Sequence, residues 1–148
     1  MESPKRILVP TDFSKSANKA FEYALMLADQ FKAELYLLHI VQEIDHYAGD
    51  YSLTKEMVKQ FKKNSLDSSK AQLQEVINKY PEAKGVKIIT EIKVGIPYQE
   101  ILYEAEKKKA DLIVIATHGK SALIHQIMGS VSERVLRGAE CPIMLLRH

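Results

Sequence analysis

The stretch from Asp111 to Val131, DLIVIATHGKSALIHQIMGSV, contains residue types suited to binding a phosphate. A short apolar run is followed by the segment Thr117–Gly119, and a second glycine, Gly129, precedes Ser130 and a helical pattern. A glycine has no Cβ, so its backbone N–H can approach a ligand closely and its φ can be positive. Ser130 offers a hydroxyl group, and the free N–H groups of the next two residues carry the positive end of the helix dipole. We interpret the stretch as the phosphate-binding part of a nucleotide site.

Each of these residues also has an ordinary structural interpretation. Gly119 and Gly129 are both typical of turns. Asp12, which follows the first apolar run, could simply cap the first helix, and Ser130 is needed as a helix cap whether or not a phosphate binds. It is the joint arrangement that indicates a site.

Other sites that these residues resemble are not supported by their spacing. Gly119-Lys120-Ser121 is similar to the end of a P-loop, but that motif needs a glycine five positions before Gly119, where Val114 stands. No G-x-G-x-x-G follows the first apolar run, which argues against a standard dinucleotide fold. His118 and His125 lack an evident third ligand, and no general base is recognisable, so we predict neither a metal site nor a catalytic centre.

Apolar periodicity divides the chain into alternating strands and helices. Short runs with β-branched residues predict strands, and apolar residues at helical spacing, preceded by caps such as Ser14 and Thr54, predict helices. A capping box at Ser130–Glu133 predicts that the last helix begins there. In the long second helix, apolar residues between Met57 and Ile77 are expected on the inner face, and Ser65–Ser69 could interrupt it. The predicted strands are 6–10, 33–41, 86–94, 111–116 and 141–147, and the predicted helices are 15–31, 54–79, 97–109 and 130–138.

This alternation predicts one α/β domain over residues 1–148, a three-layer structure in which four helices cover the two faces of a five-stranded parallel sheet. Ligands of such sheets bind beyond the carboxyl ends of the strands, where the strand order switches direction. An order of 3-2-1-4-5 makes the first and fourth strands neighbours, so that Pro10-Thr11-Asp12 and the loop before Ser130 share one crevice. There Asp12 suits a ribose hydroxyl, and the backbone at Ile40-Val41 could bind the edge of an adenine.

The composition is that of an ordinary globular protein and favours no charged macromolecule as partner. Of the 148 residues, 46% are apolar and 27% are charged, and the formal net charge is only +2. Interspersed charges of this kind give no case for nucleic acid or an anionic membrane. No apolar run approaches the roughly 18 residues of a membrane span, and the N-terminal run is too short for a signal sequence. The single cysteine, Cys141, is expected to be a small buried residue.

Several of these segments together resemble the universal stress protein family, across essentially the whole chain. The family's opening strand followed by P-T-D-x-S corresponds to Ile7–Ser14, its L-L-H-hydrophobic strand to Leu37–Ile40, and its G-x-P to Gly95–Pro97. ATP-binding members carry a glycine, two residues, a glycine, nine residues, and then a glycine followed by Ser or Thr. Here that pattern reads as Ala116–Gly119, nine residues, and Gly129-Ser130, with an alanine in place of the first glycine.

The resemblance implies a cytoplasmic α/β domain that binds ATP in one subclass and not in another. It also implies a homodimer paired through the last strand, here Pro142–Leu146, an apolar edge that would otherwise invite aggregation. Our first hypothesis is an ATP-binding regulatory protein of stress adaptation, with or without Mg or Mn, whose conformation is biased by the nucleotide and sensed by an unidentified protein partner.

A methyl group at Ala116 could crowd the ribose or a phosphate, so a dimeric interaction module that binds no nucleotide is the alternative hypothesis. A slow nucleotide hydrolase is the third, because related folds host such chemistry. The residues predicted to bind the nucleotide are Pro10, Thr11, Asp12, Ile40, Ala116, His118, Gly119, Gly129, Ser130, Val131 and Ser132.

Overall fold

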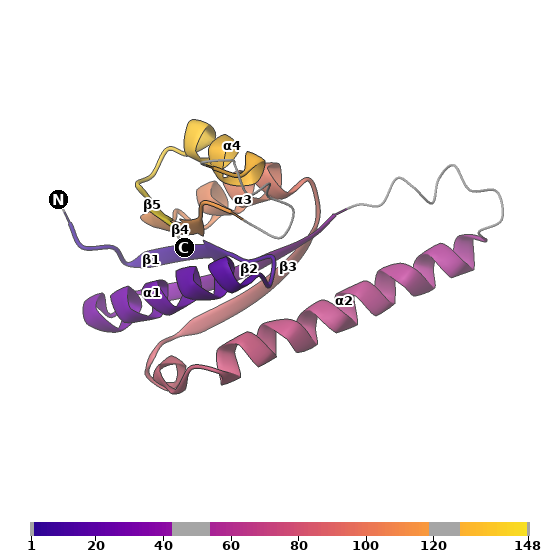
Figure 1. The fold of residues 1–148 in the computed structure, drawn as a ribbon, viewed down its shortest axis with the longest axis horizontal. Helices are drawn as coiled ribbons and strands as arrows, with labels where there is room; N and C mark the ends of the chain where they lie inside the picture. The colour runs from indigo at the N-terminus through magenta and orange to yellow at the C-terminus, as the bar shows by residue number, and fades with distance from the viewer. Residues whose placement is uncertain (1, 43–53, 119–127, 148) are drawn as a thin grey trace.

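The computed structural model describes residues 2–42, 54–118 and 128–147. In this part of the chain, five strands form one parallel sheet of order β3-β2-β1-β4-β5, and four α-helices cover it (Figure 1). The predicted α/β fold and strand order are therefore confirmed. The strands are β1 (Arg6–Pro10), β2 (Glu34–Gln42), β3 (Ile88–Gly95), β4 (Leu112–Ala116) and β5 (Ile143–Leu146). The helices are α1 (Lys15–Phe31), α2 (Lys55–Asn78), α3 (Pro97–Lys107) and α4 (Ser130–Gly138), with a short 3₁₀ helix, η2, at Pro81–Gly85.

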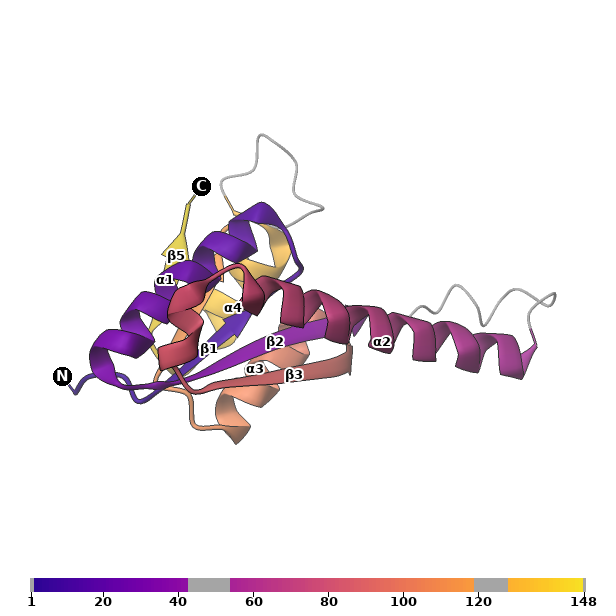
Figure 2. The ribbon, with the colours of Figure 1, turned by 90° about the horizontal axis from the view of Figure 1, so that it is seen from below.

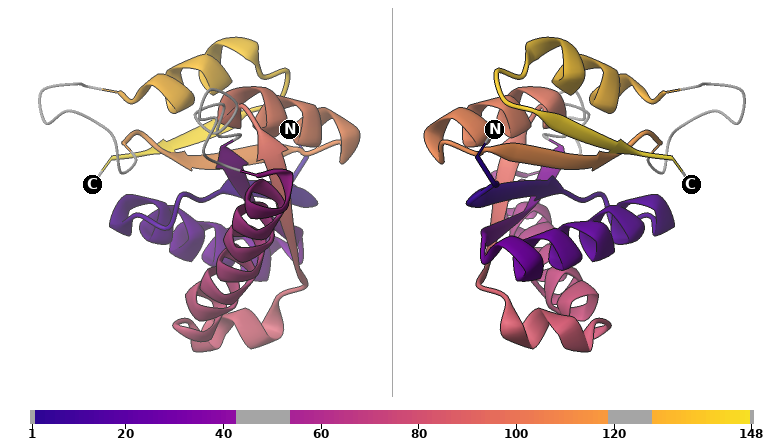
Figure 3. Two further views of the ribbon diagram at one scale, coloured as in Figure 1. Left: turned by 90° about the vertical axis from the view of Figure 1, so that its right-hand side faces the viewer. Right: turned by 90° about the vertical axis from the view of Figure 1, so that its left-hand side faces the viewer.

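The sheet lies between two helical layers, with α1 and α2 on one face and α3 and α4 on the other (Figure 3). Because successive side chains of a strand point to opposite faces, β1 contributes to both cores. Ile7 and Val9 join the α1–α2 core, and Leu8 joins the α3–α4 core. All of these side chains are fully buried, as expected of a central strand in a parallel sheet.

The helix α2 is longer than the part of the sheet that it covers. It runs without a break through the serine-rich segment, and its first half projects beyond the sheet (Figures 1 and 2). A helix of 24 residues spans roughly 36 Å, whereas the 8-residue edge strand β3 spans roughly 26 Å. The buried side chains of α2, Ser69, Leu73 and Val76, therefore lie in its second half, while Met57 and Phe61 are 43% and 42% exposed. The predicted inner face is wrong for the first half of the helix.

The outer strands of the sheet are β3 and β5. β5 begins at Ile143, later than predicted, although the Ile113 N–H already donates to the Pro142 C=O at 3.0 Å. Its side chains are all half-buried. Among the described helices, including the long α2, none is long and apolar enough to cross a membrane.

Candidate functional site

The carboxyl ends of β1, β2 and β4 open into one cavity of about 900 Å³, counting its open mouth. The first turns of α3 and α4 complete its walls. Every residue of the predicted site lines this cavity except Gly119, which lies outside the described residues. Apolar side chains and a few polar groups line it together, as in many sites for small molecules.

The cavity also has lining residues that the sequence did not single out. Leu38 and Gln42 lie two positions either side of Ile40, so the alternation of the strand could have found them. Ile101 lies one helical turn after Pro97, but nothing in the sequence placed that turn over the crevice. The added residues are Ala17, Leu38, Gln42, Pro97, Ile101 and Ile115.

The start of α4 differs from the predicted capping box. Gly129, with φ −72° and ψ 160°, is the N-cap, Ser130 is the first helical residue, and no side chain caps the helix. The Ser132 hydroxyl instead donates to the C=O of Thr117 at 2.9 Å and to that of Gly129 at 3.0 Å. The Gly129 N–H also donates to the Thr117 C=O. These bonds hold the start of α4 against the end of β4. Because Gly129 is the N-cap and Ser130 is already helical, the predicted capping box at Ser130–Glu133 is wrong.

The first N–H groups of α4 have no acceptor in the described part of the chain. Backbone bonding in the helix begins with the Glu133 N–H, which donates to the Gly129 C=O at 3.0 Å. Ser130, Val131 and Ser132 precede it, and all of them line the cavity. Uncapped N–H groups at the positive end of a helix dipole favour an anion. This end of the cavity can therefore hold a phosphate.

Gly129 fits a tight space and does not adopt an unusual backbone conformation. Its φ of −72° is ordinary, so the positive φ expected from the sequence is wrong. A Cβ here would lie 3.1 Å from the C=O oxygen of Thr117, which is closer than most Cβ atoms approach any neighbour. Since that oxygen belongs to the backbone at the end of β4, a side chain at Gly129 would require α4 or the end of β4 to shift by a few tenths of an ångström.

Local hydrogen bonds fix the end of β1 and leave Asp12 at the cavity. Thr11 is buried and its hydroxyl accepts the Phe13 N–H at 3.0 Å, so this side chain is structural. Asp12 Oδ1 accepts the Ser14 N–H at 3.0 Å, which orients the carboxylate. Ser14 is the residue that caps α1, by accepting the Ala17 N–H at 3.1 Å. Asp12 is therefore not the helix cap, and its carboxylate lies where a ribose hydroxyl could donate to it.

His39 supports the same turn from β2. Its Nδ1 lies 2.8 Å from the Thr11 C=O oxygen, and because a carbonyl can only accept, Nδ1 carries the proton. Its ring centroid lies 4.3 Å from that of Phe13, whose φ is 66°. The histidine of the L-L-H segment thus holds the strand end from which Asp12 projects.

The side of the cavity between β2 and α3 is apolar. Leu38, Ile40 and Ile101 line it and belong to the α3–α4 core. The chain enters α3 through Gly95, whose φ of 156° suits glycine, and a Cβ there would lie 2.9 Å from the Glu100 side chain. Such an apolar slot suits a planar base.

Ala116 is half-buried at the end of β4 and lines the cavity. It packs on the α1–α2 core, the face to which Val114 also points. Leu38, Ile40 and Ile101 belong to the opposite core. The side chain of Ala116 therefore lies on the α1–α2 face of the sheet, opposite the face that carries the apolar slot.

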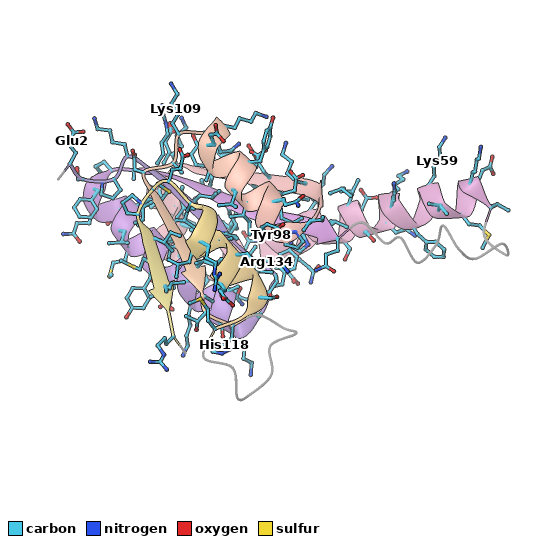
Figure 4. The ribbon with its side chains drawn as sticks, turned by 90° about the horizontal axis from the view of Figure 1, so that it is seen from above. Glu2, Lys59, Tyr98, Lys109, His118 and Arg134 are labelled. Atoms are coloured by element: carbon cyan, nitrogen blue, oxygen red, sulfur yellow. The ribbon has the colours of Figure 1, made fainter. Side chains whose placement is uncertain are left out.

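His118 and the α3–α4 contact flank the site. His118 lines the cavity, and its Nδ1 lies 3.0 Å from the hydroxyl oxygen of Thr117, which orients the ring. Arg134 of α4 lies over the ring of Tyr98 of α3, with its guanidinium carbon 4.9 Å from the centroid (Figure 4). A cation–π contact of this kind helps to hold the two helices that wall the cavity together.

A charge network fixes α3 against β3. Glu104 is fully buried, and Lys108 lies 2.6 Å from it and 2.6 Å from Glu91 of β3. Lys93 adds a contact of 3.4 Å to Glu104. Burial of Glu104 opposes its ionisation, but the hydrogen bond from Lys108 and the positive charges of Lys108 and Lys93 outweigh it and lower the pKa of the carboxyl. Because α3 carries Ile101, the network positions one wall of the cavity.

No cluster suited to metal binding is found in the described ranges, where no group of three or more His, Cys, Asp or Glu side chains is close enough together. His125, considered with His118 from the sequence, lies outside these ranges. Cys141 is half-buried, and burial raises the pKa of its thiol, so it is not a thiolate at neutral pH.

Comparison with known proteins identifies the family. The sequence profile of the universal stress protein family matches residues 4–147. The chain belongs to the universal stress protein family. Universal stress protein MJ0531 of Methanocaldococcus jannaschii is 37% identical over 148 residues, covering 97% of this chain and 82% of that relative. Universal stress protein MJ0577 of the same organism is 33% identical, covering 97% of this chain and 95% of that relative.

Solved structures of the family share the fold. The structure of MJ0577 matches with a TM-score of 0.86 at 28% identity, covering 99% of this chain and 98% of that one. A universal stress protein in complex with cAMP matches with a TM-score of 0.68 at 22% identity, covering 98% of both chains. One from Archaeoglobus fulgidus in complex with dAMP matches with a TM-score of 0.63 at 19% identity, covering 97% of this chain and 98% of that one. The predicted family is confirmed.

Proposed function

We propose that this universal stress protein binds ATP in the cavity at the ends of β1, β2 and β4, and that the bound nucleotide biases its conformation. The observation that carries the proposal is the uncapped start of α4, where the backbone N–H groups of Ser130–Ser132 have no acceptor in the described chain. A bound phosphate would satisfy these groups and the positive helix end together.

The rest of the cavity fits the remaining parts of the nucleotide. Asp12 lies at the end of β1, between the start of α4 and the apolar slot, and its carboxylate suits the ribose hydroxyls. Leu38, Ile40 and Ile101 form the slot for the base. Other universal stress proteins of this fold hold adenine nucleotides, cAMP in one and dAMP in another. The position of the Ala116 methyl on the α1–α2 side favours the ATP-binding hypothesis over the alternative without nucleotide.

Thermal unfolding with ATP tests the proposal. A ligand at 100 times its Kd adds about 2.7 kcal/mol of stability, which raises the Tm of a domain of this size by roughly 5–10 °C. We expect this rise with ATP near a millimolar, with or without Mg²⁺, and we expect Asp12→Ala to abolish it. Asp29→Ala is the matched control, because Asp29 is an exposed carboxylate of α1 that pairs with Lys32. A wild-type protein whose Tm does not respond to ATP would refute the proposal.

We also propose that two copies pair through β5, as the family resemblance implies. β5 is an edge strand with half-buried side chains. The Pro142 C=O accepts from Ile113 of β4 and the Leu146 C=O accepts from Thr117 just after β4. The backbone groups of Ile143 and Leu145 therefore point to the open edge. A second copy could cover both these groups and the apolar side chains.

A backbone substitution in β5 tests the pairing. Leu145→Pro removes an outward N–H without breaking a bond to β4, and Leu145→Ala removes similar apolar volume while keeping that N–H. We expect light scattering to show a dimer for the wild type and for Leu145→Ala, and a monomer for Leu145→Pro. A wild-type monomer at all concentrations, or a Leu145→Pro variant that remains dimeric, would exclude pairing through this edge.

A further inference from the structure

Gln42 is the last residue of β2, where it pairs with Gly95 of β3, and it lines the cavity. Residues two apart in a strand share one face of the sheet. Leu38 and Ile40 are buried on the α3–α4 face and also line the cavity. Gln42 therefore continues the same wall by one step, to the exposed outer end of the apolar slot.

The other polar side chains of the cavity lie toward β1 and β4 or are already engaged. Asp12 follows β1, and His118 and Ser130 lie at the end of β4 and the start of α4. The hydroxyls of Thr11 and Ser132 take part in hydrogen bonds within the protein. Among the described lining residues, the carboxamide of Gln42 is thus the polar side chain on the side where the base is expected.

We propose that the side chain of Gln42 recognises the base by hydrogen-bonding to the 6-amino edge of adenine, an inference that rests on the proposed nucleotide site. A carboxamide presents an acceptor, Oε1, and a donor, Nε2, side by side. The 6-amino group of adenine and the ring nitrogen beside it present the complementary donor and acceptor, and glutamine forms such paired bonds with adenine.

The neighbouring side chains cannot supply this selection. Leu38, Ile40 and Ile101 are apolar, so they contact the ring of any purine equally and cannot recognise its 6-substituent. The backbone groups at Ile40-Val41 can also bond to the edge of the base. The amide of Gln42 adds a side-chain donor and acceptor to that edge, while the apolar slot contributes most of the contact area.

Paired titrations of the full chain test this inference. The probes are ATP and purine riboside triphosphate, which has a hydrogen in place of the 6-amino group. We expect the wild type to bind ATP about tenfold more tightly than the analogue, the size of a good paired contact to a base edge. Gln42→Met keeps the side-chain volume but removes the amide, so its preference for ATP over the analogue should fall severalfold, to what the backbone at Ile40-Val41 supplies. Gln74→Met is the control, because Gln74 bonds to Asn78 on α2.

The outcomes separate this inference from the proposed function. A preference for ATP that falls severalfold in Gln42→Met and is unchanged in Gln74→Met supports recognition of the base by Gln42. If the wild type binds both probes equally, or if Gln42→Met keeps the preference, the role of Gln42 is refuted while the nucleotide site stands. If the wild type binds neither probe, the proposed function fails, and the role of Gln42 fails with it.

Discussion

Replacing Ser130 by proline tests the phosphate-binding role of the α4 backbone without disturbing the helix. Ser130 is the first helical residue, a position where proline is well tolerated because its N–H has no partner within the helix. The preceding residue, Gly129, has φ −72° and ψ 160°, the extended conformation that a residue before proline prefers. Ser130→Pro therefore removes one backbone donor and one hydroxyl while keeping the local geometry.

The expected size of the effect comes from the lost donor. A hydrogen bond to a charged group is worth about 1.5–3 kcal/mol, so losing the Ser130 N–H should raise the Kd for ATP roughly 10- to 150-fold. Ser130→Ala removes the hydroxyl alone and is the matched control, so the ratio of the Kd values of Ser130→Pro and Ser130→Ala gives the effect of the lost N–H. The free energy of unfolding without ligand should change by no more than about 1 kcal/mol in Ser130→Pro, because both backbone positions are compatible with proline.

Calorimetric titration with ATP and with adenosine gives the decisive comparison. Adenosine has no phosphate, so Ser130→Pro should weaken the binding of ATP and leave the binding of adenosine unchanged. If Ser130→Pro binds ATP as tightly as Ser130→Ala does, the backbone at the start of α4 does not hold the phosphates. An equal loss of both ligands would show that proline has deformed the cavity, which contradicts the geometry of Gly129.

Three further substitutions test other parts of the account. Ala116→Gly should leave the Kd for ATP within about threefold, because the methyl faces the α1–α2 core, whereas a tenfold gain in affinity would show that the methyl crowds the ligand. The same substitution should lower the free energy of unfolding by about 0.5–1 kcal/mol in a urea titration. Ser132→Ala should lower that free energy by about 1–3 kcal/mol, because its hydroxyl bonds to the C=O groups of Thr117 and Gly129; an unchanged urea midpoint would contradict this anchoring role. The folded pKa of Glu104 lies below its ordinary value of 4.5, so the stability that it contributes is present above that pH and is lost as the pH falls through the folded pKa. The urea midpoint of Glu104→Gln should therefore depend less on acid pH than that of the wild type, and identical pH profiles of the two proteins would exclude the linkage.

Much of the fold could be predicted because each element carries its own local pattern. Ile7–Val9 is apolar at every position, which is typical of a strand covered on both faces. In the structure, its side chains are buried in the α1–α2 core on one face of the sheet and in the α3–α4 core on the other. The strand order followed from the chemistry of the strand ends: polar residues such as Asp12 and His118 are useful together only if the first and fourth strands are neighbours. That reasoning brought residues more than a hundred positions apart into one cavity.

The failures of prediction concern features that depend on distant parts of the chain. The capping box at Ser130 satisfied the local rule for a helix start. In the structure, the Ser132 hydroxyl bonds to Thr117, 15 residues earlier, and the N-cap of α4 is Gly129. The inner face of α2 was predicted along its full length, but Met57 lies beyond the end of the sheet that the helix covers. Periodicity identifies the apolar face of a helix, and the size of the neighbouring sheet decides how much of that face is buried.

Electron density from crystals grown with ATP is the most direct measurement of the central claim. We expect density for the triphosphate at the N–H groups of Ser130–Ser132, for the ribose beside Asp12, and for the purine between β2 and α3 against Leu38 and Ile101. An empty cavity at saturating ATP, or a nucleotide bound with its phosphates away from the start of α4, would contradict the account.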